Sequence, residues 1–316
     1  MKKVLALVIA MIMMVTFIAC EGSSTKKTND EITIGVILKT LSSEYWGYVA
    51  AGVKAAEKDF GVKVNLQGPA SETSYDEQNN MIETTLSTND LDALVVAPLQ
   101  PESIAFVLGN TQIPILFVDT DAEFSNKTAY IGTGNYEAAY LGGEYAAKQK
   151  GKGAIAVVIA GVQGNTNSYE REKGYIDALE AKGVKVASVQ YAEATTDKAT
   201  NIMENMLTSL KNNVDIVCCV NDDMAAGAAN ACKQAGVEGV TIVGFDGIQT
   251  GVKNVMNGVV SASVAQSPYN MGYQAVENAV KAVKGEEVEK VIKTGVSIIT
   301  SENAKDYLAE LKSVLK

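Results

Sequence analysis

The stretch Ile113–Asp119 reads IPILFVD, an apolar run that ends in a carboxylate, and Val240–Asp246, VTIVGFD, repeats this pattern later in the chain. Two more pairs of stretches match in the same order. Ala55–Val64 matches Asp177–Val186, and Leu91–Val96 matches Val214–Cys219. In the first of these pairs a helical pattern ends at a glycine and an apolar run begins at once, which is typical of a helix followed by a strand. A chain of 316 residues has room for two domains. The ordered repeats therefore predict two similar lobes of one fold.

Short runs rich in Val, Ile and Leu alternate with amphipathic segments through most of the chain. Continuous apolar runs are typical of strands buried on both faces, as in parallel sheets covered by helices. The alternation predicts an α/β protein with two doubly wound parallel-sheet lobes. The predicted strands are Ile32–Leu38, Val62–Gln67, Ala93–Ala97, Ile113–Val118, Ala154–Ala160, Val184–Tyr191, Asp215–Val220, Thr241–Phe245 and Val260–Val264.

The N-terminus has the features of an export signal. Two lysines precede the apolar run Val4–Ile18, which is short for a membrane span. The run ends in Phe17–Cys20, which resembles a bacterial lipobox, and this resemblance implies that residues 1–19 are removed and that Cys20 is lipidated. Residues 20–30 are polar and are expected to form a flexible tether. We therefore expect an extracytoplasmic protein that is lipid-anchored to the cell membrane, and a plain core helix is the alternative interpretation.

Composition disfavours several classes of function. The formal net charge of −10 repels phosphate backbones, so nucleic-acid binding is not expected. The chain has no His, the commonest general base, and it carries no Walker A loop, nucleophile elbow or metal-binding His pair. We expect neither an enzyme nor a cofactor or metal, although two carboxylates could in principle act as a catalytic pair. Cys218, Cys219 and Cys232 lie in apolar patterns and are expected to be buried free thiols.

Polar residues follow the predicted strands at the positions where an open parallel sheet binds its ligands. They include Lys39–Trp46 after the first strand, the acids Asp119 and Asp246, Asn221–Asp223, and Arg171 beyond a Gly-rich loop. Carboxylates, amides and a guanidinium pair well with vicinal hydroxyls, and an aromatic ring packs on the apolar face of a sugar. This mixture favours a sugar or a related polyol as the ligand.

Structural roles are the alternative for each of these residues. The two acids could be N-caps of the helices that follow them, Tyr45 and Trp46 could be core residues, and Asn221 could be a turn former. Arg171 could lie on the surface, but it is the only Arg beside 26 Lys. Because Arg171 is the only Arg of the chain, we expect the forked geometry of its guanidinium to be needed at this position.

The motifs TLSSEYW at 40–46, YEREKGY at 169–175, NDDMAAGA at 221–228, VGFDG at 243–247 and AQ at 265–266 occur in this order. On these motifs, residues 32–300 resemble the ribose- and galactose-binding periplasmic proteins. The resemblance implies a polar ligand contact at Ser43 and an aromatic pair at Tyr45 and Trp46 that covers one sugar face. It implies hydrogen-bonding contacts at Asp119, Arg171, Asn221, Asp246 and Gln266.

Three positions depart from the ribose-binding pattern. Ala97 stands where an Asn contact is expected, Thr120 where a second Arg follows the first Asp, and Ala194 where an aromatic side chain would stack. We expect Thr120 to contact the ligand in place of the Arg. The changes predict a roomier pocket with fewer donors than a ribose site, for which Gln100 and Asp121 are candidates to compensate.

The resemblance also implies a hinge of three chain crossings, which we place near Thr133–Asn135, Ala265–Pro268 and Thr294–Val296. The N-terminal lobe would then be 31–133 plus 267–294, and the C-terminal lobe 134–266 plus 295–316. The expected function is capture of a small sugar or polyol by hinge closure and delivery to the permease of an ABC importer, by a protein that is a monomer. One alternative is that the protein presents its ligand to a chemoreceptor or sensor kinase. Another is that the ligand is a nucleoside or a furanosyl signalling molecule. A transcription regulator shares the core fold, but no basic helix-turn-helix precedes Ile32.

Overall fold

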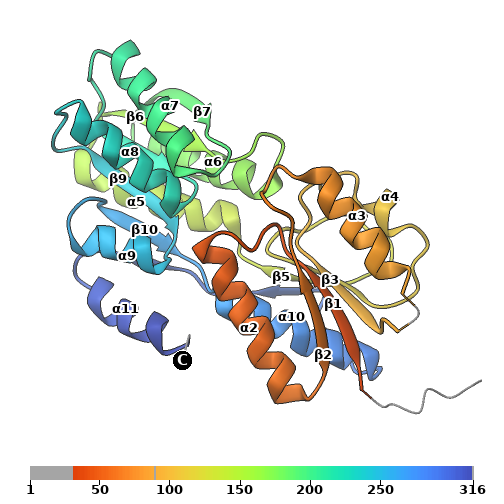
Figure 1. Cartoon of the computed structure of the whole chain (residues 1–316). Coiled ribbons are helices and arrows are strands. Elements are labelled where there is room, and N and C mark those ends of the chain that lie inside the picture. Colours follow the sequence, from red (N-terminus) through yellow and green to blue (C-terminus); the bar gives the residue numbers. More distant parts are fainter. Residues whose placement is uncertain (1–30, 89, 315–316) are drawn as a thin grey trace, which may run out of the picture. The chain divides into compact units, whose positions relative to one another are not determined.

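Two six-stranded sheets organise the protein (Figure 1). The computed structural model describes residues 31–88 and 90–314, and one compact unit begins at Ile32. The predicted signal segment and tether, with Cys20, lie outside the described residues. No helix in the described part of the chain is both long and apolar enough to cross a membrane.

The first sheet has the strand order β11-β5-β4-β3-β1-β2, and all of its neighbours are parallel. We call this sheet and the helices packed on it the first lobe. Its strands are β1 (Thr33–Ile37), β2 (Lys63–Gln67), β3 (Ala93–Val96), β4 (Ile115–Val118), β5 (Lys127–Gly132) and β11 (Val291–Lys293). Its helices are α2 (Glu44–Phe60), α3 (Tyr75–Leu86), α4 (Ile104–Leu108) and α10 (Pro268–Val283).

The second sheet has the order β12-β10-β9-β8-β6-β7, in which only β12 runs antiparallel to its neighbour. This sheet and its helices form the second lobe. Its strands are β6 (Ile155–Ala160), β7 (Lys185–Tyr191), β8 (Ile216–Cys219), β9 (Thr241–Asp246), β10 (Ala262–Ala265) and β12 (Ser297–Ile299). Its helices are α5 (Asn135–Lys150), α6 (Thr166–Ala181), α7 (Thr196–Ser209), α8 (Asp222–Gln234), α9 (Gln249–Met256) and α11 (Ala304–Ser313).

Side chains alternate between the two faces of the first sheet, as the period of a strand requires. Val36 and Val95 join the core formed with α2 and α10, whereas Ile37 and Val96 join the core formed with α3 and α4. All four side chains are fully buried. The continuous apolar runs are therefore strands covered on both faces, and the predicted class of two doubly wound parallel-sheet lobes is confirmed.

Helices α2 and α10 approach each other closely because glycines face the contact. A Cβ atom on Gly52 would lie 2.0 Å from the carbonyl oxygen of Tyr269, and one on Gly272 would lie 2.0 Å from that of Val49. The pair covers one face of the first sheet, although the two helices stand at opposite ends of the sequence.

The nine predicted strands correspond to β1–β4 and β6–β10, most with trimmed ends. Three strands were not predicted: β5, β11 and β12. Two of them have only three residues, and β5 begins with the polar pair Lys127-Thr128. The chain passes from the first sheet to the second after β5, returns after β10 and crosses again after β11.

Candidate functional site

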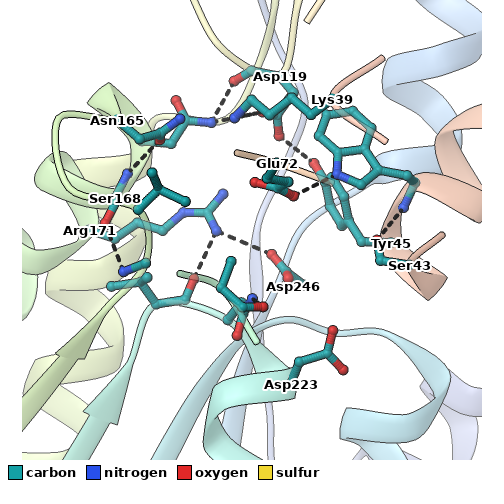
Figure 2. A pocket seen from close by; sticks show the side chains of 17 residues that line it. Lys39, Ser43, Tyr45, Glu72, Asp119, Asn165, Ser168, Arg171, Asp223 and Asp246 are labelled. Atoms are coloured by element: carbon teal, nitrogen blue, oxygen red, sulfur yellow. Dashed lines mark hydrogen bonds and ion pairs between the residues drawn. The ribbon is translucent and has the colours of Figure 1, made fainter. Parts of the chain in front are cut away.

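A cavity of about 80 Å³ lies where the carboxyl ends of the strands of both sheets meet (Figure 2). Seventeen residues line it, and they come from both lobes. The polar and aromatic residues from the first lobe are Lys39, Ser43, Tyr45, Trp46, Glu72 and Asp119. The polar residues from the second lobe are Asn165, Asn167, Ser168, Arg171, Asn221, Asp223 and Asp246.

Asp119 follows β4 and is held in the left-handed backbone region, with φ 65°. Its carboxylate accepts hydrogen bonds from the Tyr45 hydroxyl at 2.8 Å and from Asn167 Nδ2 at 2.9 Å, and it pairs with Lys39 Nζ at 3.2 Å. Burial opposes ionisation, but the charges of Lys39 and Arg171 and these hydrogen bonds hold the pKa of Asp119 below its usual value. The site therefore keeps a buried carboxylate ionised at its centre.

Arg171 projects from α6 into the cavity (Figure 2). Its Nε donates to Asn135 Oδ1 at 2.8 Å, and its Nη1 donates to the carbonyl of Val220 at 2.9 Å and to Asp246 Oδ1 at 3.2 Å. The guanidinium also lies 3.9 Å from the centre of the Phe245 ring. The interpretation of Arg171 as a surface residue is wrong, because the residue is 7% exposed and fixed on three sides.

Asp246 ends β9 as Asp119 follows β4, and it too has a positive φ, 110°. Its Oδ1 accepts from Gln266 Nε2 at 2.6 Å as well as from Arg171. Burial raises the pKa of Asp246 to about 7, although Arg171 and Gln266 favour its ionised form. Strained acidic residues at equivalent strand ends of both lobes indicate a functional constraint.

Neither acid is a helix N-cap. The N-cap of α9 is Ile248, and the element after Asp119 is the strand β5. The N-cap alternative for these two residues is therefore wrong.

Ser43 and Asn221, by contrast, cap helices while they line the cavity. Ser43 Oγ accepts from the Trp46 amide at 3.4 Å at the start of α2. Asn221 Oδ1 accepts from the Met224 amide at 2.7 Å at the start of α8, and its Nδ2 donates to the carbonyl of Ala194. A ligand must share these side chains with the helix ends.

The two predicted aromatic residues meet edge to face. The Tyr45 and Trp46 ring centroids are 5.1 Å apart at an interplanar angle of 89°, so both rings cannot lie parallel to the same sugar face. Trp46 is also a core residue, 2% exposed, and its Nε1 donates to Glu72 Oε1 at 2.8 Å. The core interpretation and the cavity-lining interpretation both describe these residues.

Seven of the nine predicted contact residues line the cavity, whereas Thr120 and Gln266 do not. Each of these two residues instead donates a hydrogen bond to an acidic residue that lines the cavity. Thr120 Oγ1 donates to Asp119 Oδ2 at 2.8 Å, and Gln266 Nε2 donates to Asp246. The proposed substitutes Gln100 and Asp121 are also absent from the lining, and Asp121 pairs with Lys127 at 2.6 Å.

Of the three departures from the ribose pattern, only Ala194 lines the cavity. Ala97 is fully buried, and its carbonyl accepts from Gln78 Nε2 at 2.9 Å. The site does not lack donors, since Lys39 and Asn167 reach Asp119 without a second Arg. The expectation of fewer donors than in a ribose site stays a prediction, because it depends on a comparison of the two pockets.

Sequence reasoning missed six polar lining residues. Lys39 and Asp223 stood within the stretches that follow predicted strands, so their position was a signal that was not used. Glu72 lies in the loop between β2 and α3, which follows the predicted strand Val62–Gln67, so it shared this signal. The other three are on or beside the first turn of α6, at Asn165, Asn167 and Ser168.

Hydrogen bonds join the two lobes across the cavity and beside it. Asn167 Nδ2 of the second lobe donates to the carbonyl of Asp119 at 3.0 Å as well as to its carboxylate. The Thr250 amide, in α9, donates to Glu44 Oε2, in α2, at 3.2 Å. The described conformation therefore brings the lobes into direct contact.

The prediction about the three cysteines is tested by the described residues. Cys218, Cys219 and Cys232 are buried and free, as predicted. Burial raises the pKa of all three thiols, which keeps them protonated. Nowhere in the described residues do three His, Cys, Asp or Glu side chains form a group suited to a metal ion.

Two parallel-sheet α/β lobes with a buried polar cavity between them define a two-lobed solute-binding protein. The model of the periplasmic binding protein domain matches residues 34–287, and the chain belongs to that family. A ribose import binding protein of Haemophilus influenzae is 30% identical, with 95% of this chain and 100% of the relative covered. The D-ribose/D-allose-binding protein of Pseudomonas aeruginosa is 28% identical, with 87% and 91% covered.

Solved structures agree with this assignment. An ABC transporter solute-binding protein from Agrobacterium vitis with bound D-fucose superposes with a TM-score of 0.83 at 28% identity, with 90% of this chain and 100% of that chain covered. These relatives are binding proteins of transport systems and not enzymes, so the chain belongs to a family of solute-binding proteins.

Proposed function

We propose that the protein captures a small sugar or sugar-like polyol between its lobes and delivers it to the permease of an ABC importer. The observation that carries this proposal is the cavity in which Asp119, Arg171 and Asp246 meet from both lobes. The named ligands of the relatives, ribose, allose and D-fucose, are all monosaccharides, which supports a ligand of this class.

The cavity suits hydroxyl groups for a physical reason. A sugar hydroxyl donates one hydrogen bond and accepts others, so it can bridge a carboxylate and a guanidinium or ammonium. Asp119 and Asp246 accept, Arg171 and Lys39 donate, and Trp46 and Tyr45 offer an apolar wall. A ligand that lacks one expected hydroxyl would leave a buried polar group unpaired, at a cost of about 1–3 kcal/mol.

Closure by a hinge is part of the proposal. We place the pivots at Thr133–Asn135, Ala265–Pro268 and Thr294–Val296, where the chain passes between the sheets. The lobe limits 31–133 with 267–294 and 134–266 with 295–316 follow from these pivots. Opening would break the Asn167–Asp119 and Thr250–Glu44 bonds, and a bound sugar would add bridges that favour the closed form.

Anchoring through a lipidated Cys20 and a monomeric state are also proposed. A Cys20→Ser variant is expected to leave the membrane fraction when the protein is produced in a bacterium with a lipoprotein pathway. Retention of the variant in that fraction would contradict the lipid anchor.

The experiment that tests the function is a thermal-shift screen over pentoses, hexoses, polyols and nucleosides. A ligand at one hundred times its Kd stabilises the folded state by about 2.7 kcal/mol, which raises the melting temperature measurably. Calorimetry on the hits then gives affinity and stoichiometry. Absence of any shift across the screen would reject a sugar-binding role, and turnover of a sugar would show an enzyme.

Ligand binding is expected to change the fluorescence of Trp46. It is the only Trp of the chain, it lines the cavity, and its indole N–H is bonded to Glu72. A ligand in the cavity alters the polarity around this ring, so the emission should shift or be quenched with the same Kd that calorimetry gives. An unchanged spectrum at saturation would show that the ligand binds elsewhere.

Affinity for a neutral sugar or polyol is expected to rise with pH between about 6 and 8. Asp246 has a pKa of about 7, and ligand hydroxyls bind its ionised form. Binding therefore lowers this pKa and releases a proton, so affinity falls as pH drops through 7. If only the ionised form binds, the Kd is roughly tenfold higher at pH 6 than at pH 8. Asp246→Asn should flatten this profile, and a wild-type Kd that is constant over the range would refute the assignment.

A further inference from the structure

The charges that line the cavity do not balance. Two cations face the cavity, and each is already committed to a carboxylate: Lys39 lies 3.2 Å from Asp119, and Arg171 lies 3.2 Å from Asp246. Two more carboxylates, Glu72 and Asp223, line the same cavity. Within the described part of the chain neither of them is paired with a Lys or Arg.

The two remaining carboxylates stand on different lobes. Glu72 lies in the loop after β2 in the first lobe, and Asp223 lies in the first turn of α8 in the second lobe. In Figure 2, Glu72 lies beside Tyr45 and Asp223 lies beyond Asp246 on the α8 side. A closed cavity therefore holds both carboxylates, one from each wall.

The surroundings of Asp223 disfavour a charge on its carboxyl group, whereas Glu72 accepts a hydrogen bond from Trp46 Nε1. Burial raises the pKa of Asp223, and the negative charges of Glu44 and Glu72 raise it further. Asp223 accepts no hydrogen bond from the described residues, whereas its neighbour Asp222 accepts from Ser263 Oγ and from the Ile248 amide. The helix dipole stabilises an acidic residue in the first turn of a helix, which applies to Asp223. It does not apply to Glu72, which lies in a loop.

We propose that the natural ligand carries a protonated amine, attracted by the negative charge that Glu72 and Asp223 add to the cavity, while its hydroxyl groups contact Asp119, Arg171 and Asp246. The inference rests on the proposed sugar-binding function and narrows it to an amino sugar or amino polyol. An ammonium group offers three donors and a positive charge, so it is attracted to these carboxylates and reduces the repulsion among the acidic residues of the cavity. The same charge balance excludes uronic acids and sugar phosphates.

Matched pairs of ligands test this inference on the full chain by calorimetry. The pairs are D-glucose with D-glucosamine, D-galactose with D-galactosamine, and myo-inositol with an aminodeoxyinositol. For at least one pair the amino member is expected to bind at least tenfold more tightly than its neutral partner. Acetylation of the amine should abolish this preference, and D-glucuronic acid should not bind.

Variants then assign the preference to the two carboxylates. Glu72→Gln and Asp223→Asn should each bring the ratio of the two Kd values within a pair closer to one. Glu83→Gln is the matched control, because Glu83 is an exposed carboxylate on α3 outside the cavity, and it should keep the preference. Melting curves confirm that each variant is folded.

Two results would overturn the inference and leave the proposed function intact: equal or tighter binding of the neutral member in every pair that binds, or a preference that survives in both carboxylate variants. If no sugar or polyol of either kind bound, the proposed function and the inference would fail together.

Discussion

Arg171→Ala is expected to raise the Kd of the ligand found by the screen at least tenfold. The substitution removes a guanidinium that holds Asp246, the Val220 carbonyl and Asn135 at once. Charge-assisted hydrogen bonds contribute about 1.5–3 kcal/mol each, and tenfold in Kd corresponds to about 1.4 kcal/mol. The variant also leaves Asp246 without its cation in a buried site, so its melting temperature should fall.

Calorimetry at a temperature where circular dichroism shows the folded variant separates the two effects. Lys173→Ala is the control, because this lysine lies on the same helix but points to solvent, and it should bind as the wild type does. Arg171→Lys should weaken binding as well, since an ammonium cannot reproduce the fork geometry. An unchanged Kd in Arg171→Ala would remove Arg171 from the binding site.

Asp119→Asn is expected to weaken binding by a similar factor, at least tenfold. The amide is neutral and carries two donors, so it cannot satisfy Lys39, Tyr45 and Asn167 together as the carboxylate does. Asn tolerates the positive φ of this position, so the fold should persist. The loss should therefore appear in affinity measured by calorimetry on a folded protein.

Asp121→Asn provides the matched comparison for this variant. Asp121 lies two residues further on and pairs with Lys127 outside the cavity. Its replacement should leave the Kd within twofold of the wild type. Equal weakening by both substitutions would mean that net charge, and not the position of Asp119, controls binding.

The fold could be predicted to the extent that its elements are long and buried. The strands that precede Asp119 and Asp246 are fully buried apolar runs, and burial on both faces leaves a strong pattern. Strands β11 and β12 have three residues each, and only one of these six residues is buried, so they are too short and too exposed to show a pattern. They pair because the sheet edge supplies hydrogen-bonding partners, which is a property of the tertiary structure.

The site could be predicted where it depends on strand ends. Asp119 and Asp246 follow strands, and the sheet itself brings them to the cavity. Glu72 and Asn167 reach the cavity from a loop and from the first turn of a helix, and their direction depends on packing that one sequence does not reveal. Gln266 was expected to touch the ligand, but it orients Asp246 from behind.

The glycine-mediated contact between α2 and α10 has a consequence for biosynthesis. Five of the six strands of the second sheet follow one another from Ile155 to Ala265, so this lobe can nearly complete itself as the chain emerges. The first lobe stays incomplete until α10 is synthesised, more than two hundred residues after α2. Only then is one face of its sheet fully covered. We therefore expect the second lobe to fold first, while the nascent N-terminal half exposes part of one face of its sheet until α10 is made.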